Sequence, residues 1–105
     1  MIVTTTESVP GREVQAVMGL VRGNTVRAAH AQHDIAAWMK NLVGGEIHEY
    51  TKLMAEAREQ ALDRLEAEAR ARGADAIVGL RFVTCEIASG AAEFLAYGTA
   101  VKLRP

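Results

Sequence analysis

The sequence is poor in the features that mark several common protein classes. Its 105 residues include a single cysteine, Cys85, so the chain can form neither an internal disulfide nor a Cys-x-x-Cys metal knuckle. No apolar run approaches the ~18 residues that a membrane span needs, and the first residues lack a basic segment followed by an apolar one. A reducing compartment suits this composition, so we expect a cytoplasmic protein that does not enter a membrane.

The sequence also lacks an excess of charge of either sign. Twelve Lys plus Arg oppose thirteen Asp plus Glu, which gives a formal net charge of −1. Because a basic excess is what attracts phosphate backbones, we expect no nucleic-acid partner. A chain of 105 residues with 50% apolar content fits one core and is too short for two ordinary domains, so we predict one domain over residues 1–105.

Two β-rich segments open the chain. Ile2 to Thr6 is a short β-branched run, and the Pro10-Gly11 turn separates it from a second apolar run, Val14 to Val26, which predicts a β-hairpin. Strict alternation would place Met18 and Leu20 on one face of the second strand and Val17 and Val21 on the other. Two glycines in this run are candidates for bulges or close packing, Gly19 and Gly23.

The periodicity then changes to that of helices. A short amphipathic helix is predicted from Asp34, a suitable N-cap, to Val43, and Gly44-Gly45 follows it. A long helix is predicted from about Glu46 to Arg72, ended by Gly73. Its apolar stripe organises the core and consists of Ile47, Tyr50, Leu53, Met54, Ala57, Ala61 and Leu65.

Two more strands are predicted after the long helix, at about Ala76 to Ile87 and Glu93 to Leu103, with a hairpin loop between them. The fold class is therefore α+β: a ββαββ-like subunit with one long helix on a small, mostly antiparallel sheet, plus a short helix before it. The strands are apolar on both faces, whereas one helix covers only one. We therefore predict a homo-oligomer, although the short helix from Asp34 to Val43 is an alternative cover for the second face.

A series of residues, densest around the long helix, stands in one order along the chain: Gly44-Gly45-Glu46, Tyr50, Ala57-Arg58, Ala61, Glu68-Ala69, the run from Gly73 to Gly79, and Gly98-Thr99-Ala100-Val101. Together these residues resemble the YbjQ-like family of small uncharacterised bacterial and archaeal proteins. The similarity spans nearly the whole chain and is densest between Gly44 and Gly79. Heavy-metal binding has been ascribed to this family, and its subunits are described as ββαββ-like units in pentameric rings, so the resemblance implies a pentamer.

A divalent metal has few candidate ligands in this chain. His30 and His33 would share a face if their segment is helical, and imidazole suits metals such as zinc or nickel. Two histidines do not make a complete site, and solvated loop histidines are the alternative interpretation. None of the histidines matches a position of the family pattern. The remaining candidates are Asp34, His48, Cys85 and Glu86.

An enzymatic site is the second functional hypothesis. Glu46, Tyr50 and Arg58 could bind a ligand or act in a site assembled between subunits, but the sequence contains no recognised catalytic constellation. Glu68 lies near the centre of the apolar stripe, where pairing with Arg64 or Arg72 would make it structural. The first hypothesis, a homo-oligomeric binding or structural module holding a metal or small ligand at subunit interfaces, is therefore favoured.

Overall fold

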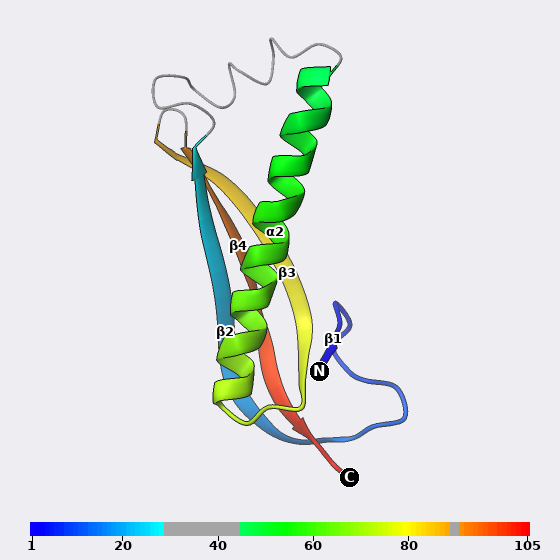
Figure 1. The fold of residues 1–105 in the computed structure, drawn as a ribbon. Helices are drawn as coiled ribbons and strands as arrows, with labels where there is room; N and C mark the ends of the chain where they lie inside the picture. Colours follow the sequence, from blue (N-terminus) through cyan, green and yellow to red (C-terminus); the bar gives the residue numbers. More distant parts are fainter. Residues whose placement is uncertain (29–44, 89–90) are drawn as a thin grey trace.

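The computed structural model describes residues 1–28, 45–88 and 91–105, and these form one helix on one face of a four-stranded sheet (Figure 1). The predicted α+β class is confirmed, and the predicted short helix from Asp34 to Val43 lies outside the described residues. The elements are β1 (Ile2–Val3), β2 (Val14–Ala28), α2 (Gly45–Ala71), β3 (Ala76–Ala88) and β4 (Ala91–Leu103).

The sheet has the strand order β1-β3-β4-β2, with β4 antiparallel to both of its neighbours. The predicted hairpin between the first two strands is wrong, because β1 pairs in parallel with β3, with Ile2 opposite Ala76. The Pro10-Gly11 turn does form, but it joins only Val9 to Arg12. The connection then runs round the end of the sheet to reach β2 at the opposite edge (Figure 1).

Two glycines change which side chains face the helix. Gly19 and Gly79 have φ values of 108° and 65°, which L side chains rarely adopt, and the strand register shifts beside both. As a result Met18 packs on the helix side of the sheet while Leu20 is exposed, and Val78 and Leu80 join different apolar clusters. Strict alternation fails at both positions for this reason.

The core lies between α2 and the two strands β2 and β4. The buried stripe of α2 includes Ala57, Ala61 and Leu65, as its periodicity predicted, and it packs on Val21 and Ala96. Small residues allow a close approach, since a Cβ added at Gly23 would overlap the backbone of the helix. Gly73, with φ of 76°, ends α2 by donating its N–H to the carbonyl of Arg70 at 3.0 Å.

The chain is long and thin. Its extents are 51 × 24 × 16 Å, and its radius of gyration of 16.7 Å exceeds the roughly 13 Å typical of a compact chain of this length. Its accessible surface of 6530 Å² also exceeds the roughly 5,700 Å² expected for a folded monomer of this mass. Among the described residues, the sheet carries a helix on one side only, which is consistent with both differences.

Candidate functional site

The sheet face that points away from α2 exposes large apolar side chains. Leu20 and Val26 lie on β2 and are 58% and 54% exposed, and Val83 on β3 is 45% exposed. Their cross-strand partners on β4 include Thr99 and Leu95, and the intervening β4 residues are buried beneath α2. Exposed apolar side chains gathered on one face are typical of an interaction surface.

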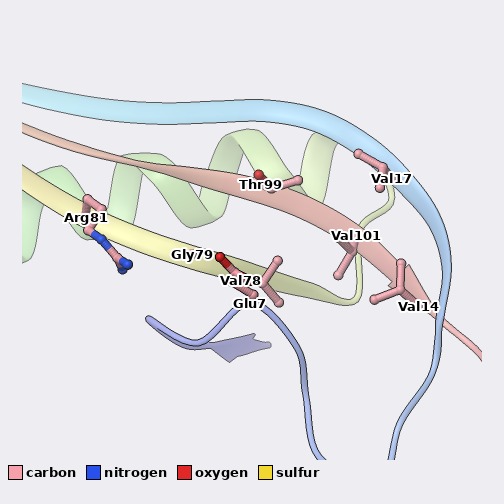
Figure 2. Close-up of a pocket in the computed structure, with 8 residues that line it drawn as sticks. All are labelled: Glu7, Val14, Val17, Val78, Gly79, Arg81, Thr99 and Val101. Carbon is pink, nitrogen blue, oxygen red and sulfur yellow. The ribbon is translucent and has the colours of Figure 1, made fainter.

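One end of this face is hollowed into a pocket of about 440 Å³ (Figure 2). Three strands contribute to it, with α2 behind the sheet in this view. Its apolar wall is made of valines: Val14, Val17, Val78 and Val101. Its polar residues are Glu7, Arg81 and Thr99. Gly79 also lines the pocket. The pocket thus combines apolar surface with one cation, one acid and one hydroxyl.

Arg81 fixes the position of the N-terminal segment beside this pocket. Its Nη1 donates to the carbonyl oxygens of Thr5 at 3.0 Å and Leu80 at 2.7 Å. The N–H of Gly79 donates to the carbonyl of Thr6 at 2.8 Å, which brings Glu7 to the pocket. Arg81 is exposed and its bonds use only one of the three guanidinium nitrogens, so donors remain for a ligand.

The chemistry of the pocket suits a small amphipathic anion. A guanidinium binds carboxylate or phosphate oxygens through paired N–H donors, and a hydroxyl supplies a further donor. The valine wall favours an apolar body on the same molecule. These groups can bind and orient a ligand, and no nucleophile with an adjacent base is present among the residues that line the pocket.

None of the site residues predicted from the sequence is among the described residues that line this pocket. His30 and His33 fall outside the described residues, and Glu46 and Tyr50 lie in the first turns of α2, where the backbone alone is described. Arg58 is exposed on α2. Twelve residues of helix place the backbones of Glu46 and Arg58 about 18 Å apart along the axis, so within one chain they do not form one compact site.

Glu68 forms one of the two ion pairs predicted for it, the pair with Arg72. One carboxylate oxygen lies 2.9 Å from Nη2 of Arg72, and the other accepts the backbone N–H of Arg22 at 3.1 Å. The charge at the centre of the stripe therefore ties the helix to β2. No comparable signal for the pocket is present in the sequence, apart from Arg81 as an isolated charge within an apolar strand.

Comparisons with known proteins place this chain in a family. A family model described as "Putative heavy-metal-binding" matches residues 1–104. A UPF0145 protein from Archaeoglobus fulgidus is 58% identical over 104 residues, which cover 99% of this chain and 96% of that protein. Another from Methanoculleus marisnigri is 56% identical over 105 residues, covering 100% and 98%. The chain belongs to the YbjQ-like family.

A solved structure also resembles the fold. It is the crystal structure of a protein of unknown function, of the DUF74 family, from Pediococcus pentosaceus. The TM-score is 0.66 at 18% sequence identity, with 99% of this chain and 98% of the other covered. At that identity the likeness concerns the fold alone.

The metal-binding description of the YbjQ-like family can be compared with the residues of this member. Among the side chains that the structure describes, no three or more His, Cys, Asp or Glu residues gather as a metal site. Cys85 is exposed on β3, away from any such group in the described part of the chain. A search of the same residues finds no helix long and apolar enough to cross a membrane.

Proposed function

We propose that this YbjQ-like protein is a homo-oligomeric binding module that holds a small anionic ligand where its subunits meet. The observation that carries the proposal is the apolar sheet face, which no described element covers. Each large apolar side chain removed from water contributes about 1.5–3 kcal/mol, so covering several of them favours association. The elongated subunit supports the same proposal, and the family resemblance favours a pentamer among the possible assemblies.

Ligand binding is proposed for the pocket at the end of this face. The pocket is open in a single subunit, and a neighbouring copy lying on the apolar face would enclose it. Enclosure lowers the local dielectric and strengthens the attraction between Arg81 and an anion. The proposed ligand is therefore a small carboxylate or phosphate compound with an apolar body.

Native mass spectrometry of protein purified without added metal tests this proposal. We expect an oligomer carrying a small bound molecule, and we expect Arg81→Gln to lose that molecule while remaining assembled. Arg58→Gln is the matched control, because Arg58 is also an exposed arginine but lies on α2, on the other side of the sheet. Loss of the ligand from Arg58→Gln alone would contradict the pocket and support the site at Glu46, Tyr50 and Arg58.

An enzyme remains the alternative for that second site. Since Glu46 and Arg58 are separated along one helix, such a site would need residues from two copies. Hydrolytic turnover by the purified protein that is abolished in Arg58→Ala and retained in Arg81→Gln would favour the enzyme over the binding module.

Metal binding between copies is a second candidate, favoured by the description of the family. A single cysteine per chain can contribute to a thiolate site only where symmetry brings several copies together. Titration with zinc and nickel, comparing the native chain with Cys85→Ser and with His30→Ala/His33→Ala, tests both candidate ligand groups. Failure to bind either metal below about millimolar concentration would contradict this function.

A further inference from the structure

The pocket at the end of the apolar sheet face is lined by two opposite charges that do not pair with each other. Among the described residues, no ion pair joins Glu7 to Arg81, although both line the pocket. The side-chain bonds of Arg81 run from Nη1 alone and end on two backbone carbonyls. An anion bound at Arg81 would therefore leave the carboxylate of Glu7 in the same pocket without a counter-charge.

The segment that carries Glu7 is fixed on both sides of this residue. Oγ1 of Thr6 donates to the carbonyl of Ser8 at 2.6 Å, and the carbonyl of Thr6 accepts the N–H of Gly79 at 2.8 Å. The hydroxyl of Thr4 lies 2.8 Å from that of Thr6. Figure 2 shows this segment running beside β3, below the pocket. Backbone and hydroxyl bonds thus hold the acid at the pocket, and its charge is free to bind a ligand.

The remaining wall of the pocket suits a branched aliphatic group. Val78 and Val101 are buried, and Val17 is 68% exposed, so a ligand can remove much of this last side chain from water. The volume of about 440 Å³ is in the range of small-molecule sites. The pocket therefore offers a cation, an acid and an aliphatic surface to one small molecule.

We infer that the ligand of this pocket is an α-amino acid with a branched aliphatic side chain, such as leucine. Its carboxylate binds Arg81, its ammonium group binds Glu7, and its side chain packs on the valines. This inference rests on the proposed ligand pocket and narrows its substrate class. A carboxylate without the ammonium group brings a like charge towards Glu7, and that repulsion weakens binding most where the pocket excludes water.

Three probes test the inference on the full chain by calorimetric titration. They are L-leucine, isocaproate, which lacks the amine, and isoamylamine, which lacks the carboxylate. We expect leucine to bind roughly tenfold or more tightly than either analogue, because each analogue leaves one charged group of the pocket without its hydrogen-bonded partner.

Glu7→Gln identifies the group that recognises the amine. Glu7 is exposed, so the fold should survive the substitution. We expect this variant to bind leucine and isocaproate with nearly equal affinity. Glu13→Gln is the matched control, because Glu13 is also an exposed acid but pairs with Arg104 and does not line the pocket. The control should keep the preference for leucine.

The outcomes separate this inference from the proposed function. If the native chain binds isocaproate as tightly as leucine, the amino-acid class is wrong and the anion pocket survives. A preference for leucine that persists in Glu7→Gln overturns the inference too, as does failure of every probe to bind at millimolar concentration. The proposed ligand site itself fails only if native mass spectrometry finds no small molecule that is lost in Arg81→Gln.

Discussion

The two faces of the sheet are built from the same strands, but one face is buried under α2 and the other exposes apolar side chains. Under α2 the sheet residues are buried, from small ones such as Ala96 and Ala100 to larger ones such as Ile77, and Gly23 lets the helix backbone approach closely. On the other face Leu20, Val26 and Val83 are larger and remain largely exposed. The helix-covered face is complete within one subunit, and the other face has the composition of a core without its second layer. The difference supports the proposal that copies of the chain meet on the uncovered face, while folding depends on the face under α2.

The largest effect is expected on the uncovered face. Leu20→Lys combined with Val26→Lys would place two charges in the proposed interface, where unpaired charges are costly to bury. Both side chains are mostly exposed in one subunit, so the fold should survive. We expect complete dissociation to monomers by light scattering, with the helical circular dichroism retained. Glu59→Lys with Asp63→Lys, on the exposed face of α2, is the charge-matched control and should remain assembled.

A substitution on the face covered by α2 should instead lower the stability of the folded chain. Gly23→Ala adds a Cβ that would overlap the backbone of Ala61 and Leu65, which flexible side chains cannot relieve. We expect the free energy of unfolding to fall by about 3 kcal/mol, measured by urea denaturation at one fixed protein concentration. Asn24→Ala, the neighbouring exposed position, is the control. Equal stability of Gly23→Ala and the native chain would contradict the close helix packing.

A smaller effect is expected from one hydrogen bond across the same contact. Thr25 is 2% exposed, and its Oγ1 donates to the carbonyl of Ala57 at 2.9 Å. Thr25→Val keeps the shape and removes this donor, so unfolding should become easier by about 1 kcal/mol. Thr84→Val, at an exposed position of β3, should change stability much less. Similar values for the two variants would show that the bond to the helix contributes little.

The sequence allowed the elements of each face to be predicted better than their pairing. The β-branched runs and the 3.6-residue stripe through Ala61 and Leu65 depend on local periodicity, and both were confirmed. The pairing of β1 with β3 joins segments over 70 residues apart, for which no local signal exists. The register shifts at Gly19 and Gly79 placed neighbouring side chains on the face opposite to the expected one. A bulge of this kind inserts an extra residue into the strand, which strict alternation does not anticipate, and the positive φ of each glycine permits it.

The candidate pocket was not predictable for the same reason. Its lining joins Glu7 to residues from three strands, and none of these is distinctive by type or spacing. Glu46, Tyr50 and Arg58 were predicted instead because their side chains could act as an acid, a base or a ligand-binding cation. The uncovered face was correctly expected from the apolar residues on both sides of the strands, although the bulges change which residues occupy it.

Other copies of the chain are proposed to cover the second face of the sheet. Size-exclusion chromatography with light scattering of the native protein, at micromolar concentration and in several salt concentrations, tests this proposal most directly. We predict a single species whose mass is a multiple of 11.3 kDa and which persists in high salt, because apolar contacts are not screened by ions. A species of 11.3 kDa under these conditions would contradict the account.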